Sequence, residues 1–273
     1  MMNRLLVAII GIPILIFILL NGGFPLLIFC NFVIVVGLYE FYRMAELGGK
    51  NPSKILGYAG GILIPNLVYF TTPENSILAL AFPLVLITLG SMGIRVLENK
   101  VENSSVDIGV TLLGVTYVSV LFSHLILMDY LPNGGKWLLV VQILVWVCDS
   151  FAYFTGITIG RKFFKNGFSI ISPKKSVEGS IGGILFTIVA LFILNRYMNL
   201  ISGIYSDYII VALGVAISVI AQIGDLGESM FKREFKIKDS GRLLGEHGGI
   251  LDRFDSMLFV VPTVYYILRF FVF

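Results

Sequence analysis

Long apolar stretches recur along the whole of this chain and constrain its fold more than any other feature. A helix needs about 20 predominantly apolar residues to cross a bilayer, and nine stretches of the sequence meet this criterion. The chain is 57% hydrophobic and only 14% charged, whereas soluble domains carry about 25% charged residues. The sequence therefore predicts an all-α, polytopic integral membrane protein. The predicted spans are residues 5–20, 24–42, 55–71, 77–94, 107–127, 137–155, 181–199, 207–227 and 254–272.

The basic residues are distributed unevenly between the two sides of this predicted membrane topology. Of the 20 Lys and Arg residues, only Lys136, Arg196 and Arg269 fall on the side opposite the N-terminus. Cytoplasmic loops carry an excess of Lys and Arg, so we expect nine spans with the N-terminus in the cytoplasm and the C-terminus outside. Most of the cytoplasmic basic residues lie in two loops, 161–178 and 228–253. This placement explains the net charge of +3 without a nucleic-acid partner.

The acidic residues suggest a metal site near the cytoplasmic face. Asp225 and Glu228 share a helical face at a spacing of i, i+3, Asp252 and Asp255 repeat that spacing, and Asp149 lies within the sixth span. Carboxylates at this depth are costly unless they are paired or bind a cation, and oxygen ligands without His or Cys pairs suit Mg²⁺. Ion pairs with nearby Lys and Arg are the alternative. We favour ion pairing for Glu228, but metal binding for Asp225 and Asp252, because these two bracket a Gly-rich loop.

Two short motifs in the basic loops have both a functional and a structural interpretation. His247-Gly248-Gly249 could present backbone N–H groups to an anion, although such a motif alone is more typical of a turn. Ser172-Pro173-Lys174-Lys175-Ser176 offers lysines and hydroxyls to phosphate. It is equally typical of a helix start, with Ser176 as the N-cap and Glu178 in the first turn. Cys30 and Cys148 are interpreted as buried small hydrophobic residues.

Residues 149–255 resemble one known family. The resemblance is carried by Ser229-Met230-Phe231-Lys232-Arg233, then Lys238-Asp239-Ser240-Gly241, then the run from Leu244 to Asp255 (LGEHGGILDRFD). Asp149, Ala152-Tyr153, Gly160-Arg161 and the Ser-Pro-Lys-Lys run match the same family further upstream. Together these residues resemble the signature of phosphatidate cytidylyltransferases, also called CDP-diacylglycerol synthases. One departure is Gly245-Glu246, where members of that family often have Pro-Gly.

The resemblance implies a reaction in which CTP and phosphatidate give CDP-diacylglycerol and pyrophosphate, with Mg²⁺ as cofactor and a second cation left open. It implies CTP, phosphatidate and membrane lipids as partners, and leaves a homodimer open. The residues expected to act in catalysis are Asp225, Asp252, Lys174, Lys175 and His247. Those expected to bind substrate phosphates are Ser172, Lys174, Lys175, Lys232, Arg233, Lys238, Gly248, Gly249 and Arg253. The expected metal ligands are Asp225, Asp252, Asp255 and Asp149.

These expectations divide the chain into two regions. Residues 1–135 would form the first five spans, and residues 136–273 a catalytic region comprising the last four spans and the two basic loops. We expect a multi-pass protein of the cell (inner) membrane whose active site faces the cytoplasm. A cation-coupled transporter is the alternative from a different class, but such folds usually show internal repeats, and none is apparent. The carboxylate spacing of CDP-alcohol phosphotransferases, a third possibility, is also not found.

Overall fold

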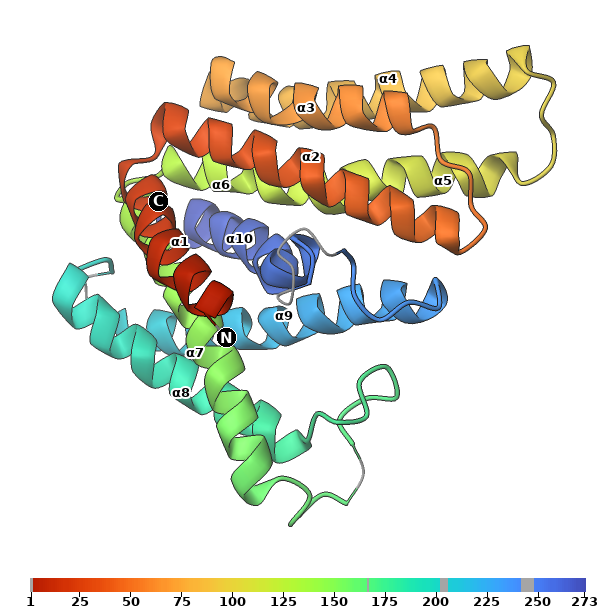
Figure 1. Cartoon of the computed structure of the whole chain (residues 1–273). Helices are drawn as coiled ribbons and strands as arrows, with labels where there is room; N and C mark the ends of the chain where they lie inside the picture. Colours follow the sequence, from red (N-terminus) through yellow and green to blue (C-terminus); the bar gives the residue numbers. More distant parts are fainter. Residues whose placement is uncertain (1, 166, 202–205, 242–247) are drawn as a thin grey trace. The chain divides into compact units, whose positions relative to one another are not determined.

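The regular secondary structure of this protein is helical. The computed structural model describes residues 2–165, 167–201, 206–241 and 248–273 (Figure 1), and within these ranges it contains no strand. The all-α prediction is confirmed. The helices are α1 (Met2–Asn21), α2 (Gly23–Leu47), α3 (Lys54–Phe70), α4 (Ser76–Leu97), α5 (Ser104–Gly114), α6 (Leu121–Asp129), α7 (Gly134–Ile159), α8 (Val177–Met198), α9 (Ser206–Glu234) and α10 (Leu251–Phe271), with a 3₁₀ turn at Pro73–Asn75 and a π-helical turn at Val115–Val120.

Seven helical segments in the described part of the chain are long and apolar enough to cross a membrane, and two shorter apolar helices accompany them. Large apolar side chains are exposed along these helices. On α4, for example, Ile77 is 73% exposed, Leu78 66% and Leu89 63%. Such apolar surface is unfavourable in water and suits a hydrocarbon solvent. The polytopic membrane class is therefore confirmed, and each predicted span overlaps a helical segment, while the number of crossings and the side on which each terminus lies stay predictions.

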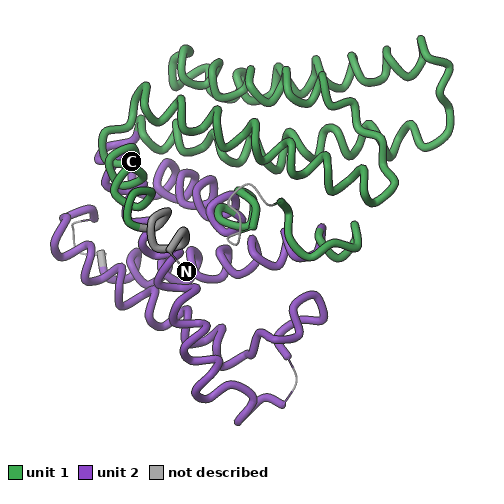
Figure 2. The backbone as a smooth tube through the Cα atoms, in the orientation of Figure 1, with its two compact units in different colours: residues 1–130, 232–254 green, residues 131–231, 255–273 purple. Residues whose placement is uncertain are grey.

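The chain folds into two compact units (Figure 2). Unit 1 comprises residues 1–130 and 232–254, and unit 2 comprises residues 131–231 and 255–273. The segment that follows α9 thus belongs with the N-terminal helices, although it lies about a hundred residues further along the chain. The predicted division into residues 1–135 and 136–273 is a division by catalytic role, whereas the two compact units are defined by contacts within each unit. The predicted division therefore stays a prediction.

Unit 1 is built around α2. This helix lies beside α3 and α6, and α3 lies beside α4 (Figure 1). Gly114 passes so close to the rings of Phe41 and Tyr42 that a Cβ there would lie 2.6 Å from Tyr42. The Tyr42 hydroxyl also donates a hydrogen bond to the Thr111 carbonyl at 2.9 Å, where the α-helical pattern changes to the π turn. Phe41 packs edge-on against Phe235 at 6.3 Å between centroids, which holds the returning segment on α2.

Unit 2 is organised by the close packing of α7 and α8. Gly183 of α8 lies against the Cys148 carbonyl and the Ala152 methyl of α7, where an added Cβ would be 3.2–3.3 Å from both. Small residues of this kind let membrane helices approach closely. Farther along, the Ser256 hydroxyl of α10 donates to the Ala221 carbonyl of α9 at 3.0 Å. These contacts fix the part of α7 that carries Asp149 next to the start of α8.

A buried ion pair joins three parts of unit 1, namely α4, α5 and the loop between α2 and α3. Arg95 at the end of α4 pairs with Asp107 of α5 at 2.8 Å, and the two side chains are only 8% and 6% exposed. Asp107 also accepts a hydrogen bond from the Asn51 backbone N–H at 2.8 Å, and Arg95 donates to the Asn51 carbonyl at 2.6 Å. The loop between α2 and α3 is therefore held by a charged pair that water barely reaches.

We expect Asp107→Asn to destabilise the protein by about 3 kcal/mol, because it leaves the buried Arg95 guanidinium without its counter-charge. The thermal unfolding midpoint in detergent would measure this loss. Glu98→Gln is the matched control, because its pair with Lys100 is exposed and is worth at most about 1 kcal/mol. Equal midpoints for the two variants would contradict a stabilising role for the buried pair.

Candidate functional site

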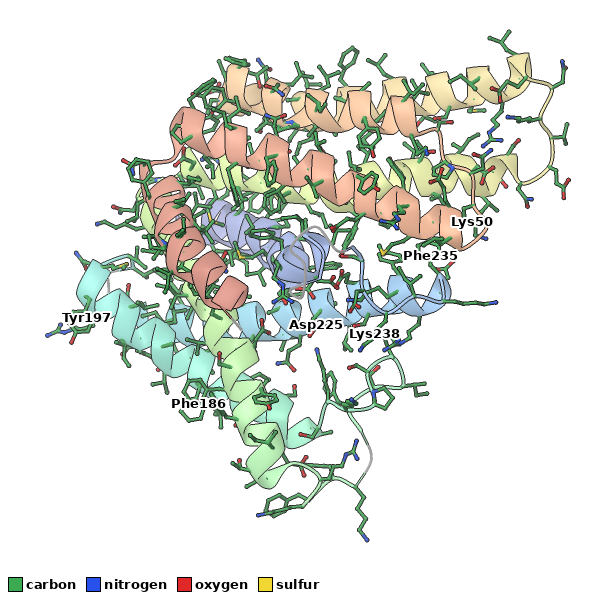
Figure 3. The ribbon with its side chains drawn as sticks, viewed as in Figure 1. Lys50, Phe186, Tyr197, Asp225, Phe235 and Lys238 are labelled. Atoms are coloured by element: carbon green, nitrogen blue, oxygen red, sulfur yellow. The ribbon has the colours of Figure 1, made fainter. Side chains whose placement is uncertain are left out.

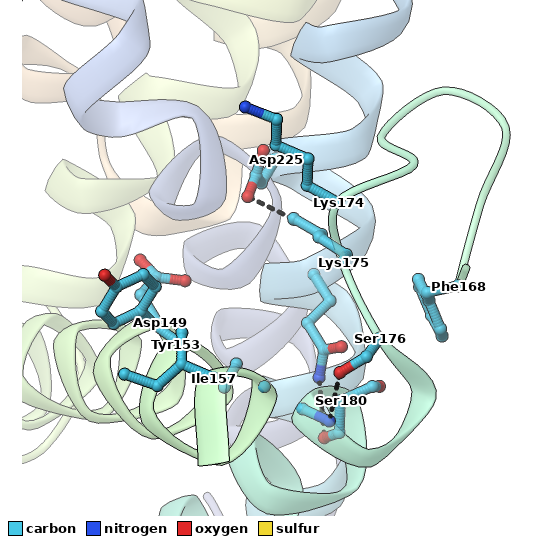
Figure 4. A pocket seen from close by; sticks show the side chains of 13 residues that line it. Asp149, Tyr153, Ile157, Phe168, Lys174, Lys175, Ser176, Ser180 and Asp225 are labelled. Atoms are coloured by element: carbon cyan, nitrogen blue, oxygen red, sulfur yellow. Dashed lines mark hydrogen bonds and ion pairs between the residues drawn. The ribbon is translucent and has the colours of Figure 1, made fainter. Parts of the chain in front are cut away.

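A cavity of about 540 Å³ in unit 2 contains four of the residues predicted from the sequence (Figure 4). Asp149 comes from α7, Lys174 and Lys175 from the loop before α8, and Asp225 from α9. The cavity thus combines two carboxylates with two ammonium groups. Its lining is completed by Ala152, Tyr153, Gly156, Ile157, Phe168, Ser176, Gly179, Ser180 and Gln222.

Asp225 and Lys175 form an ion pair inside this cavity (Figure 4). The two side chains are 33% and 31% exposed, so the pair is accessible to a ligand rather than locked in the interior. The Ser229 hydroxyl, one helical turn further along α9, lies 3.5 Å from the other carboxylate oxygen of Asp225. The sequence predicted both charged residues for the site but not their pairing, because they are 50 residues apart.

Asp149 faces the same cavity without a hydrogen bond or ion pair to any residue in the described ranges. A carboxylate on a membrane-spanning helix is costly unless water or a cation compensates its charge. The donor atoms here are carboxylate, hydroxyl and amide oxygens, which are the ligands that Mg²⁺ prefers. The chemistry of the donor set therefore fits Mg²⁺, although the described residues include no cluster of three or more acidic, His or Cys side chains arranged around one point.

The remaining wall of the cavity is apolar. Tyr153 and Ile157 lie one and two turns beyond Asp149 on α7, and Phe168 comes from the loop before α8 (Figure 4). Tyr153 is 65% exposed and Ile157 63% exposed. The cavity is therefore amphipathic, with charged groups in one part and apolar side chains in another.

The start of α8 holds the loop that carries the two lysines. The Ser176 hydroxyl accepts a hydrogen bond from the Gly179 N–H at 3.1 Å, which confirms the predicted N-cap. Glu178, in the first turn, accepts hydrogen bonds from the backbone N–H groups of Phe163 and Phe164, both at 2.9 Å. Glu178 is 5% exposed. The structural interpretation of this motif is thus correct, and it leaves the Lys174 and Lys175 side chains directed at the cavity.

Ser172, predicted to bind phosphate, takes part in the turn that precedes the lysines. Its carbonyl accepts a hydrogen bond from the Lys175 N–H at 3.1 Å, and the Arg161 guanidinium donates to the neighbouring Pro173 carbonyl at 2.6 Å. Ser172 does not line the cavity. A direct phosphate contact by its hydroxyl stays a prediction.

A second cluster of predicted residues lies in unit 1, around Asp252. One oxygen of Asp252 accepts from the Lys232 ammonium at 2.6 Å. The other accepts from the Gly249 N–H at 2.8 Å and from both the N–H and the hydroxyl of Ser240, at 3.1 and 2.9 Å. Asp252 thus organises the segment on either side of it, while its first oxygen, with one bond to a described residue, keeps a lone pair for another ligand.

The Asp252 carboxylate lies against the two glycines just before α10, Gly248 and Gly249. Gly248 has φ +81°, and a Cβ there would lie 2.7 Å from the Asp252 carboxylate, so a larger residue would be strained and would collide. The Gly249 N–H is already donated to Asp252. Binding of substrate phosphate by these two residues stays a prediction.

The other predicted residues are distributed between the units. In unit 1, Lys238 lines a cavity of about 480 Å³ together with Arg43 of α2, while Arg233 and Arg253 are exposed. In unit 2, Asp255 accepts a hydrogen bond from the Ser256 N–H at 2.6 Å. His247 lies outside the described residues. The contribution of Asp225 and Asp252 to one common site also remains a prediction.

Sequence reasoning overlooked Glu40 of α2. Its side chain is 2% exposed and accepts hydrogen bonds from the backbone N–H groups of Ile250 and Leu251. Its position near the end of the predicted span 24–42 could have drawn attention to it, since a carboxylate within an apolar stretch is costly and needs a partner. Nothing local indicated that the partner is the start of α10.

Comparison with known proteins gives a consistent result over almost the whole chain. Residues 2–271 match the model of the cytidylyltransferase family. The chain is 32% identical over 272 residues to the phosphatidate cytidylyltransferase of Staphylococcus epidermidis, covering 96% of both chains. It is 32% identical over 276 residues to that of Staphylococcus aureus, and 30% identical over 272 residues to that of Staphylococcus saprophyticus, again covering 96% of each chain. The comparisons do not support the transporter alternative.

We expect Glu178→Ala to release the turn at residues 161–165, because two backbone N–H groups lose a charged acceptor worth about 1.5–3 kcal/mol each. Trypsin should then cleave after Arg161, Lys162 or Lys165 about tenfold faster or more, since cleavage follows the population of the open form. Glu178→Gln is the control, because its amide oxygen can still accept both bonds. Equal cleavage rates for Glu178→Ala and wild type would show that Glu178 does not hold this turn.

Proposed function

Because the chain belongs to the cytidylyltransferase family, we propose that it is an enzyme that transfers a cytidylyl group from CTP to phosphatidate. The products are CDP-diacylglycerol and pyrophosphate. The observation that carries the proposal is the amphipathic cavity of unit 2, which combines Asp149, Asp225, Lys174 and Lys175 with apolar side chains on a membrane helix. The names of the similar staphylococcal proteins support the same substrates.

The reaction makes one phosphorus–oxygen bond and breaks another. A phosphate oxygen of phosphatidate attacks the α-phosphorus of CTP, and the bond from that phosphorus to the oxygen bridging to the β-phosphorus breaks. Pyrophosphate leaves with the electron pair. The attacking oxygen is already anionic near neutral pH, so the step requires alignment and charge neutralisation rather than a strong base.

Lys174 and Lys175 are suited to this neutralisation. Both line the cavity, and an ammonium group there can donate to the phosphates of either substrate and stabilise the charge that develops on the leaving pyrophosphate. The apolar wall formed by Tyr153, Ile157 and Phe168 suits the hydrocarbon portion of the lipid. The same cavity can therefore receive a charged headgroup next to apolar chains.

We propose that Asp149 and Asp225 hold Mg²⁺, and that Asp252 and Asp255 are further candidates as ligands. When bound, the ion would neutralise phosphate charge and lower the barrier to attack at phosphorus. This assignment is supported by the oxygen donors in the cavity and by the Asp149 carboxylate, which has no hydrogen-bond or ion-pair partner among the residues that the structure describes. We also propose that the two basic loops face the cytoplasm, where CTP is dissolved.

The decisive assay supplies the purified protein with CTP labelled at the α-phosphate, phosphatidate and Mg²⁺. We expect label to enter the lipid phase together with an equal amount of pyrophosphate. A folded protein that gives no lipid-linked label would refute the proposal. Omission of phosphatidate is the control, and in its absence no labelled lipid should form.

We expect Asp225→Asn to reduce turnover by about 100-fold or more, in line with the loss of one charge-stabilising group at a reacting phosphate. Asp207→Asn is the matched control on the same helix, because Asp207 is exposed at the other end of α9 and should leave turnover unchanged. A wild-type rate for Asp225→Asn in monodisperse protein would remove Asp225 from the catalytic group.

We expect Ile170→Cys to react with a membrane-impermeant maleimide only from the cytoplasmic side. Ile170 is 98% exposed, and the native Cys30 and Cys148 are both 0% exposed, so the background should be low. Tyr197→Cys is the control. Tyr197 is 84% exposed at the far end of α8 and points away from the neighbouring helices (Figure 3), so its label should come only from outside. Labelling of Ile170→Cys from outside would overturn the proposed orientation.

A further inference from the structure

Glu40 is a buried carboxylate whose hydrogen bonds all reach a distant segment of the chain. One oxygen accepts from the Ile250 N–H at 3.0 Å, and the other accepts from the Leu251 N–H at 2.9 Å and lies 3.2 Å from the Ser240 hydroxyl. The side chain is 2% exposed. A charge this deeply buried requires such donors, so Glu40 depends on Ser240, Ile250 and Leu251, and these three residues depend on Glu40.

The hydrogen bonds of Glu40 go to the start of α10, which gives them a specific role. The first backbone N–H groups of a helix have no partner within the helix, and the helix dipole favours negative charge at this end. Glu40 supplies both the acceptors and the charge. It therefore caps α10 from a residue of α2 that lies 210 positions earlier than Ile250.

The glycines of this segment make room for the same carboxylate. A Cβ on Gly249 would lie 2.5 Å from both oxygens of Glu40, and a Cβ on Gly241 would lie 2.8 Å from its carboxylate carbon. Real Cβ atoms do not approach oxygen or carbon so closely. Gly241 and Gly249 are thus fitted to Glu40, in addition to any direct role in binding a substrate.

Ser240 connects Glu40 to Asp252. Its hydroxyl lies 3.2 Å from Glu40 and 2.9 Å from Asp252, and its backbone N–H donates to the same oxygen of Asp252 at 3.1 Å. Ser240 is 4% exposed, so the three residues form a connected polar group with little access to water. A change at Glu40 is therefore expected to move Ser240, and with it two of the four groups that donate to Asp252.

We infer that Glu40 is a positioning residue for the transfer reaction. It holds Ser240 and the start of α10, which carries Asp252, in their active geometry without contacting substrate. The inference rests on the proposed function and on the predicted catalytic role of Asp252. Displacement of a reacting group by about 1 Å can cost about 100-fold in rate, so loosening the anchor should lower kcat more than it raises KM.

Glu40→Gln is the principal test. A glutamine side chain has one oxygen acceptor, and its NH₂ group would face a backbone N–H that now lacks a partner. We expect kcat to fall about tenfold or more, while the KM for CTP changes by less than about threefold. Hydrogen exchange of the Ile250 and Leu251 amides should accelerate about tenfold or more.

Glu46→Gln is the matched control on the same helix. Glu46 pairs with Lys54 at 2.7 Å, but the two side chains are 39% and 47% exposed, so neutralising Glu46 should leave kcat and exchange at wild-type values. Should Glu40→Gln fail to fold, Ser240→Ala removes only the hydroxyl that links the two carboxylates. We expect Ser240→Ala to lower kcat about fivefold or more, while its thermal midpoint falls by no more than about 5 °C.

Two results would overturn the inference. The first is wild-type kcat in Glu40→Gln, and if exchange is nevertheless faster in that variant, Glu40 is only a structural cap. The second is wild-type kcat in Ser240→Ala when Glu40→Gln does not fold. A wild-type protein that makes no labelled lipid would instead refute the proposed function, and the exchange rates would still decide whether Glu40 anchors the start of α10.

Discussion

The structure depends on buried carboxylates that accept hydrogen bonds from the backbone of polar loops. A loop that leaves a membrane helix exposes N–H groups which water or a protein acceptor must satisfy. Asp107 accepts from the loop between α2 and α3, Glu178 accepts from the loop between α7 and α8, and Glu40 accepts from the segment before α10. In each case the same hydrogen bonds both compensate the buried charge and hold the loop in place. Removing either partner leaves the other unsatisfied, so these contacts are interdependent.

The anchoring carboxylates differ from those that face the cavity of unit 2. Glu40 and Glu178 are at most 5% exposed and accept hydrogen bonds from backbone donors, at both oxygens of Glu40 and at one oxygen of Glu178. Asp225 is about one-third exposed and has Lys175 as its counter-charge, while Asp149 has no hydrogen-bonding partner among the described residues. Buried carboxylates that accept backbone hydrogen bonds stabilise the fold, whereas accessible ones retain lone pairs for a ligand that arrives from solvent. Exposure and hydrogen bonding thus separate structural acids from candidate catalytic acids more clearly than sequence spacing does.

The parts of the fold that the sequence predicted are those determined by local composition. The bilayer fixes the length of an apolar helix, so the spans could be read from hydropathy, and the Ser176 cap followed from residues within one turn of it. The pairing of Lys175 with Asp225 and the contact of Glu40 with Leu251 join residues far apart in the chain, and no local pattern encodes them. The π turn at Val115–Val120, which begins where the rings of Phe41 and Tyr42 pack against Gly114, was likewise not predicted.

The ion pair of Lys175 and Asp225 also bears on how a phosphate ligand and a cation would influence each other. A phosphate that binds Lys175 would take away the counter-charge of Asp225. Two carboxylates, Asp225 and Asp149, would then face the same cavity with Lys174 as the remaining ammonium group in its lining, and an excess of negative charge is unfavourable where water is scarce. A divalent cation bound to both would restore neutrality, and its affinity would therefore rise with phosphate occupancy. By linkage, the cation would strengthen phosphate binding by the same factor. If Asp149 and Asp225 hold Mg²⁺ as proposed, the charges in the cavity would favour joint binding of a nucleotide and a cation over binding of either one alone.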